Sequence, residues 1–188
     1  MRRNCHGVRI IGNQVFVMGY AMKTTTLTII LILAIAATMA LPSYSDDMSP
    51  SEKYIRHFLK NYPTRMAKAL ELLPIIEGYS AIHAIEPMLT TATIAAESSF
   101  KPSAHNDGKN ERGLMQVHGV CARGYDLSDV HQQIAAGVAC LALARDACDG
   151  SLRQTISQYI SGHCEPRTER TKNVVARRVR VIEKWSNR

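Results

Sequence analysis

The chain of 188 residues has room for one domain of ordinary size, in addition to what its termini carry. Its 23 Lys and Arg residues exceed its 16 Asp and Glu residues, which gives a net charge of +7 and favours anionic partners. No basic–aromatic motif accompanies this charge, so the composition argues against a nucleic-acid-binding protein.

A secretory signal is predicted at residues 22–45, at the end of a leader that spans residues 1–45. Lys23 provides a basic start, residues 27–41 are almost wholly apolar, and Ser43 and Ser45 match the small-x-small pattern before a cleavage site. The apolar run is shorter than the roughly 20 residues that span a bilayer. We therefore favour cleavage after Ser45 over an uncleaved anchor, and expect an exported protein, periplasmic or secreted, with residues 46–188 as the mature domain.

The mature region is predicted to be mostly helical, because apolar residues recur at helical spacing between Pro, Gly and Asp punctuation. The expected helices are 51–60, 64–77, 87–98, 129–147, 152–160 and a last one from after Pro166 to about Trp185. Residues 101–112 lack periodicity and contain Pro, Asn, Asp and Gly, which is typical of a loop. We expect an all-α (α-dominated) single domain, with at most a minimal β-hairpin or an irregular loop after the helix that ends near Ser98.

Glu97 is the first candidate for catalysis, because it follows the apolar segment Thr93–Ala96 at the end of a predicted helix. It is either exposed on the last helical turn or held in an apolar pocket. A carboxyl group in an apolar pocket retains its proton near neutral pH and can act as a general acid. Glycosidases use such an acid to protonate the glycosidic oxygen.

Four segments in order resemble the soluble lytic transglycosylase family, whose fold is lysozyme-like. AESSFKP at 96–102 is followed, after the loop, by GLMQV at 113–117. AGVACL at 136–141 resembles the family's Gly-Val-x-x-Leu segment, and YISG at 159–162 matches in part its tyrosine followed by Asn-Ala-Gly. The resemblance covers residues 88–161, and the pairing of Glu-Ser with Gly-Leu-Met-Gln is its most specific part.

The resemblance implies that Glu97 is the single catalytic acid and base. It also implies a set of residues that contact the substrate or support the acid, namely Ser98, Ser99, Met115, Gln116 and Tyr159. Ser98 would bind the N-acetyl group or orient the acid, and Gln116 and Tyr159 would line the cleft and reach the acid or the sugar. Without these motifs, Ser98 would be interpreted as an ordinary helix end, Gln116 as an exposed amide and Tyr159 as a core aromatic residue.

Two positions depart from the family pattern: Ile160 replaces the Asn, and Glu111 stands where a small residue is common. Two-carboxylate glycosidases place a second carboxylate about 5–5.5 Å or about 6.5–9.5 Å from the acid, and Asp107 and Glu111 are the candidates near Glu97 in sequence. Their ordinary interpretation is solvated loop charges. A transglycosylase needs neither, because the C6 hydroxyl of the muramyl residue attacks its own C1, and an intramolecular attack is entropically favourable.

Histidine spacing gives no metal motif, since no HExxH pattern connects His83, His105, His118, His131 and His163. We expect neither a metal nor a cofactor. His118, two residues after Gln116, is either a cleft residue or an exposed loop residue. Trp185 is interpreted as a packing anchor of the last helix.

Four cysteines remain in the mature part, Cys121, Cys140, Cys148 and Cys164, and an even number in an exported domain predicts two disulfides. Cys140 and Cys148 lie on one predicted helix about 12 Å apart, beyond the reach of a disulfide unless the helix ends between them. We favour Cys140 with Cys164 and Cys121 with Cys148. A four-cysteine zinc site is disfavoured, because no CxxC pair is present.

We therefore expect a monomeric, exported peptidoglycan lytic transglycosylase that cleaves the MurNAc-β-1,4-GlcNAc bond and leaves 1,6-anhydro-MurNAc ends. Its partners would be glycan strands and an envelope-spanning secretion, conjugation, pilus or phage apparatus. The basic residues of 167–188 are either a solvated helix face or a surface attracted to an anionic polymer. One alternative is a hydrolytic muramidase in which Asp107 or Glu111 assists water. A second alternative is a catalytically decayed wall-binding or assembly protein.

Overall fold

The computed structural model describes residues 48–187 of the chain, and proline is the first or second residue of each of the first four helices there. These helices are α2 (Pro50–Phe58), α3 (Pro63–Glu71), α4 (Leu73–Ile82) and α5 (Pro87–Ser98). Proline suits the first turn because its missing N–H has no intrahelical acceptor there and its φ is already helical. Pro74 also corrects one prediction: the single helix expected at 64–77 is two helices that meet at Leu72.

Three helices form the second half of the fold, α6 (Val130–Asp146), α7 (Leu152–Ser161) and α8 (Glu169–Ser186), after a short 3₁₀ helix, η1 (Gly119–Ala122). Asp129 caps α6 by accepting from the backbone N–H of His131, and Thr168 caps α8 by accepting from that of Thr171. These bounds agree closely with the helices predicted from periodicity.

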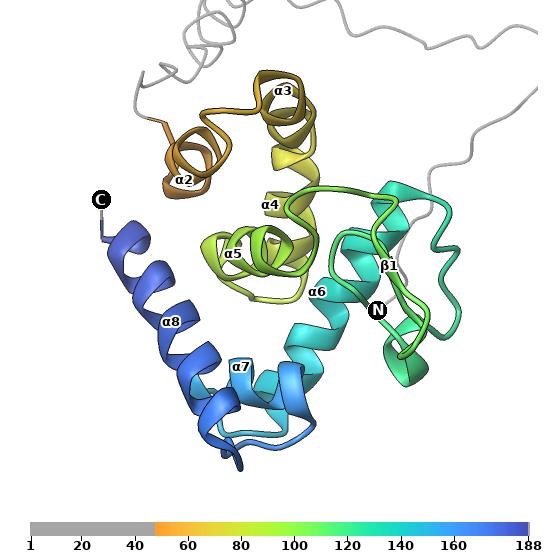
Figure 1. Cartoon of the computed structure of the whole chain (residues 1–188), viewed down its shortest axis with the longest axis vertical. Helices are drawn as coiled ribbons and strands as arrows, with labels where there is room; N and C mark the ends of the chain where they lie inside the picture. Colours follow the sequence, from red (N-terminus) through yellow and green to blue (C-terminus); the bar gives the residue numbers. More distant parts are fainter. Residues whose placement is uncertain (1–47, 188) are drawn as a thin grey trace, which may run out of the picture. The chain divides into compact units, whose positions relative to one another are not determined.

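Helix α5 is the central element, and it packs against α2, α4, α6 and α8 (Figure 1). Nine of its twelve residues are buried, including three threonines. Thr91 and Thr93 donate to the carbonyls of Pro87 and Leu89, and the Thr90 hydroxyl lies 2.9 Å from that of Ser80 on α4. Because each hydroxyl has a partner, burial of these polar groups carries no large penalty. A well-anchored helix therefore carries Glu97 on its last turn.

The loop after α5 folds into a minimal antiparallel hairpin of β1 (His105–Asn106) and β2 (Glu111–Arg112). An additional bridge joins Arg112 to Val117, which folds the segment 113–117 back towards the hairpin. This is the only sheet within residues 48–187. The fold is helix-dominated, which confirms the predicted class.

Two disulfides are present, but their pairing corrects our prediction. Cys121 is bonded to Cys140, and Cys148 is bonded to Cys164, with Cα–Cα distances of 5.4 and 5.5 Å. The reason is tertiary: η1, which contains Cys121, packs on α6 beside Cys140. Cys148 lies beyond the end of α6, where the segment after α7 brings Cys164. The exclusion of a Cys140–Cys148 bond is confirmed.

No helix among residues 48–187 is long and apolar enough to cross a membrane. The predicted leader at 1–45 and its signal at 22–45 lie outside the described residues.

Candidate active site

Glu97 lies in an ion pair at the end of α5. Arg178 of α8, 81 positions further along the chain, donates from Nη1 to Glu97 Oε1 at 2.8 Å. Both side chains are largely shielded, with exposed fractions of 21% for Glu97 and 13% for Arg178. Arg178 Nε is buried and has no hydrogen-bond partner within the described residues. The Glu97 carboxylate is therefore paired with a partly buried cation, whereas the sequence analysis considered an apolar pocket around it.

Two tyrosines interact electrostatically with charges of this ion pair. Burial raises the pKa of Tyr54 on α2 to about 12, and the Arg178 charge partly opposes that rise. Burial also raises the pKa of Tyr159 on α7, with the charges of Glu97 and Glu111 acting in the same direction and that of Arg178 against it. Both phenols therefore remain neutral around physiological pH, so they are available as hydrogen-bonding groups near Glu97.

Tyr159 is fixed to the Gly-Leu-Met-Gln segment, because its hydroxyl donates to the carbonyl of Met115 at 2.7 Å. Met115 is itself fully buried and packs against α6 at Gly137. A Cβ at position 137 would lie 2.2 Å from Met115 Sδ, so only glycine permits this approach. Met115 therefore supports the site through its backbone carbonyl and its packing.

Gln133 on α6 holds the other side of this segment. The backbone N–H of Leu114 donates to Gln133 Oε1 at 2.8 Å, and Gln133 Nε2 donates to the carbonyls of Pro102 and Leu127. Gly113 has a φ of +76°, and a Cβ there would lie 2.5 Å from the Gln133 side chain. Sequence reasoning missed this residue. The sequence shows only two adjacent amides, Gln132 and Gln133, before an apolar run, and the structure shows that Gln133 is 4% exposed.

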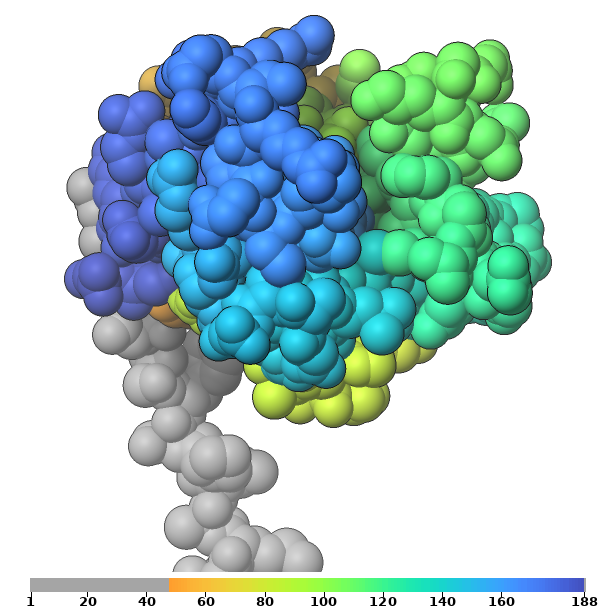
Figure 2. Space-filling view, turned by 90° about the horizontal axis from the view of Figure 1, so that it is seen from below, coloured from red at the N-terminus to blue at the C-terminus, as the bar shows by residue number. Residues whose placement is uncertain are grey.

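Gln116 lines a cavity of about 630 Å³ between the hairpin side and α7, which Figure 2 shows as a hollow between the green and blue surfaces. Glu111, Tyr159 and Ile160 line the same cavity. Gln116 has a φ of +49°, and its Nε2 donates to the carbonyls of Ala104 and Gly113. The structure thus brings Gln116 and Tyr159 together at one cavity. Within the described residues, neither hydrogen-bonds Glu97.

Ser98 and Ser99 form the turn that ends α5. The Ser98 hydroxyl is buried and donates to the carbonyl of Ile94 at 3.1 Å. Ser99 and Phe100 follow with φ values of +53° and +60°. Two successive non-glycine residues in the left-handed region are strained, and such strain is frequent beside functional sites. The chain therefore turns sharply away directly after Glu97.

The loop carboxylates have their own partners. Asp107 is 75% exposed and lies 3.5 Å from Arg112. Glu111 is 19% exposed, accepts from Asn106 Nδ2 at 2.9 Å and lies 3.7 Å from Lys109. His118 is exposed at the rim of the cavity that Gln116 lines. Across residues 48–187, no group of His, Cys, Asp and Glu side chains could hold a metal ion.

Arg178 is the second residue that sequence reasoning missed. It was counted only as one of the basic residues of 167–188. Helical spacing contained a signal: Val174, Arg178 and Ile182 are four residues apart, so they lie on one face of α8. A cation on the apolar face of a helix requires a buried or half-buried partner.

A model of the Transglycosylase SLT domain family matches residues 74–177, which is more than half of the chain. The match contains Glu97, Gln116 and Tyr159. It extends at both ends beyond residues 88–161, the range of the resemblance seen in the sequence. It stops one residue before Arg178. No match was found among curated proteins. The chain belongs to the transglycosylase SLT domain family, whose members act on the cell wall.

Proposed function

We propose that this protein is a lytic transglycosylase that cleaves the MurNAc-β-1,4-GlcNAc bond of peptidoglycan and leaves 1,6-anhydro-MurNAc ends. The observation that carries the proposal is the setting of Glu97. It is one carboxylate, placed at the end of a buried helix and held by Arg178 at 2.8 Å, inside the segment that matches the SLT family. The carboxylates of the neighbouring hairpin are engaged by Arg112, Asn106 and Lys109.

In the first step, protonated Glu97 gives its proton to the glycosidic oxygen, the C1–O bond breaks, and GlcNAc leaves with a free 4-hydroxyl. Positive charge develops at C1 of the muramyl residue, where the substrate's own N-acetyl group can stabilise it. In the second step, the C6 oxygen bonds to C1 and the C6 hydroxyl proton returns to the Glu97 carboxylate. Arg178 pairs with the carboxylate form of Glu97, which is the form that the second step uses.

The supporting residues keep specific atoms available for the sugar. Both hydrogens of the Gln116 amide are donated to backbone carbonyls, so its Oε1 is the remaining group and suits an N–H donor such as the N-acetyl amide. The Tyr159 hydroxyl donates to the carbonyl of Met115, so its oxygen can accept a further hydrogen bond. The Ser98 hydroxyl is used within α5, so Ser98 acts by positioning Glu97.

One observation favours a second candidate, a hydrolytic muramidase. Glu111 lines the same cavity as Tyr159, and its charge contributes to the raised pKa of that tyrosine. A carboxylate in this place could activate water as the second group of an inverting glycosidase. Against it, Glu111 is held by Asn106 and Lys109 on a surface hairpin.

We further propose that residues 22–45 are a secretory signal and that residues 46–188 act outside the cytoplasm as a monomer, alone or with an envelope-spanning apparatus. The two disulfides support this setting, since such bonds persist in oxidising compartments.

Mass spectrometry of a cell-wall digest tests the reaction. We expect 1,6-anhydro products from the wild-type protein, no soluble products from Glu97→Gln, and unchanged anhydro products from Glu111→Gln. Reducing ends that disappear in Glu111→Gln would establish the muramidase instead. If the folded wild-type protein releases nothing, the protein is a wall-binding module and the enzyme assignment fails.

A further inference from the structure

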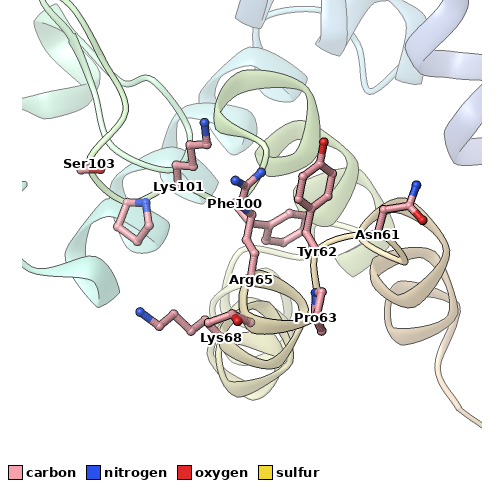
Figure 3. A pocket seen from close by; sticks show the side chains of 10 residues that line it. Asn61, Tyr62, Pro63, Arg65, Lys68, Phe100, Lys101 and Ser103 are labelled. Carbon is pink, nitrogen blue, oxygen red and sulfur yellow. The ribbon is translucent and has the colours of Figure 1, made fainter.

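A second pocket, of about 500 Å³, lies between the start of α3 and the segment that follows the turn at the end of α5 (Figure 3). One wall comes from the start of α3 and the residues before it, and the other from the segment that follows Glu97. Three cations line it: Arg65 and Lys68 project from α3, and Lys101 projects from the facing loop. Tyr62 and Phe100 contribute aromatic rings.

The three cations have no carboxylate partner in the part of the chain that the structure describes. Within residues 48–187, none of Arg65, Lys68 and Lys101 forms an ion pair, and the charge contact of Arg65 is with the ring of Tyr62 at 4.8 Å. Lys68 and Lys101 are exposed to solvent. Three like charges around one pocket repel one another unless an anion joins them. The pocket therefore favours a ligand that brings negative charge.

The pocket walls are also partly apolar. Pro63 and Pro102 stand beside the rings of Tyr62 and Phe100. Phe100 is almost fully buried and packs against Phe58, with ring centroids 6.4 Å apart. This packing gives the pocket a firm floor. A ligand with both carboxylates and short alkyl groups fits these walls better than a purely polar anion does.

The pocket lies close to the bond that Glu97 would cleave. Phe100 and Lys101 follow Glu97 by three and four residues, so the Cα atoms of Lys101 and Glu97 are at most about 14 Å apart. A peptide of four or five residues spans about 15 Å when extended. A peptide attached to a sugar at Glu97 is therefore long enough to span the distance to the pocket.

The α3 half of the pocket lies outside the family match, which begins at residue 74. Arg65 and Lys68 are thus features of this chain that the SLT domain assignment does not account for. The cavity lined by Gln116 and Tyr159 lies within the match by contrast.

We propose that Arg65, Lys68 and Lys101 bind the carboxylates of the short peptide that a muramyl residue of peptidoglycan carries, while the sugar lies at Glu97. This inference rests on the proposed function and extends it from the glycan to its peptide. The protein is then selective for glycan strands that still carry peptides. A wall polymer with phosphate groups would satisfy the cations, but it would leave the proline and aromatic walls without a partner.

The first experiment compares two substrates: glycan strands with their peptides, and the same strands after an amidase has removed the peptides. The triple variant Arg65→Gln, Lys68→Gln, Lys101→Gln is expected to raise KM for the peptide-bearing strands by about 10- to 100-fold, since charge-assisted hydrogen bonds are lost. Its kcat and its activity on stripped strands should not change. Equal losses on both substrates, or no loss on either, would overturn the proposal.

A matched control removes the same charge elsewhere, with Arg153→Gln, Arg167→Gln and Arg170→Gln, which are exposed and outside the pocket. We expect this variant to treat both substrates as the wild type does. If it loses the peptide preference to the same degree, the effect is net charge and the pocket assignment fails. Equal melting temperatures of the three proteins establish that each is folded.

A second experiment separates this inference from the proposed function. Binding of the isolated stem tetrapeptide to the mature protein is measured by calorimetry, without any cleavage. The wild type should bind it at least about 10-fold more tightly than the pocket variant. This result can stand even if no anhydro product is found in the digest. Inorganic phosphate that displaces the tetrapeptide at equal concentration would overturn the peptide assignment in favour of a general anion site.

Discussion

Glu97 and Glu111 have similar exposed fractions, 21% and 19%, but the structural elements that carry them differ in how firmly they are packed. Glu97 projects from a helix that four other helices surround, and its partner is an arginine on one of them. Glu111 belongs to a two-residue strand, and its partners, Asn106 and Lys109, are exposed residues of the same hairpin. A site built on a packed helix keeps its geometry within the narrow limits that catalysis requires, whereas a hairpin does not. Exposure alone would not have separated the two.

The sharpest way to break this comparison is to neutralise each glutamate in turn. Glu97→Gln should lower kcat by about 10²- to 10⁴-fold, the usual contribution of a general acid and base. Glu111→Gln should change kcat by less than about threefold, because its interactions are those of a surface hairpin. Release of anhydro-muropeptides measures both. A larger loss for Glu111→Gln would place the chemistry on the hairpin.

Arg178→Met tests whether the cation is part of the Glu97 setting. We expect about a 10- to 100-fold loss of kcat and a loss of about 1–3 kcal/mol in the free energy of unfolding, since a shielded carboxylate loses its partner. Arg178→Lys should recover part of both. A double variant with Glu97→Gln should be no less active than Glu97→Gln alone. Independent, additive losses would show that Arg178 serves only the fold.

Gly137→Ala tests the close packing of Met115 against α6. The added methyl group would overlap Met115, so we expect a loss of about 1–3 kcal/mol in the free energy of unfolding and reduced activity. Urea denaturation measures the first. Gly78→Ala is a matched control, because a Cβ at position 78 meets no atom within 4 Å. If Gly137→Ala left the free energy of unfolding unchanged, the packing of Met115 against α6 would be able to adjust to the added methyl group.

Tyr159→Phe is expected to lower kcat less than Glu97→Gln or Arg178→Met does. It removes one hydrogen bond, to the carbonyl of Met115, which contributes about 1 kcal/mol to the free energy of unfolding. We expect a kcat reduced by less than about tenfold. A loss as large as that of Glu97→Gln would make Tyr159 a proton donor in the reaction and would revise the role of Glu97.

Local signals predicted most of the secondary structure and singled out Glu97 as the first candidate residue. Pro87 placed the start of α5, and helical periodicity placed α6, α7 and α8 to within a few residues. The break at Leu72 could also have been read from Pro74, because a proline interrupts the backbone hydrogen bonds of a helix. The segments AESSFKP and GLMQV identified Glu97 and Gln116, and the family match includes both.

What the sequence by itself determined are features that depend on neighbours along the chain: helices, a minimal hairpin, the number of disulfides and a glutamate at a helix end. Tertiary structure alone decided four features: the ion pair of Glu97 with Arg178, the hydrogen bonds of Gln133 to the segment around Leu114, the pairing of Cys121 with Cys140, and the basic pocket that α3 forms with the loop after α5. The physical reason is distance along the chain. Each of these features includes a contact between residues that are 19 or more positions apart, and only the packing of whole helices brings such residues together.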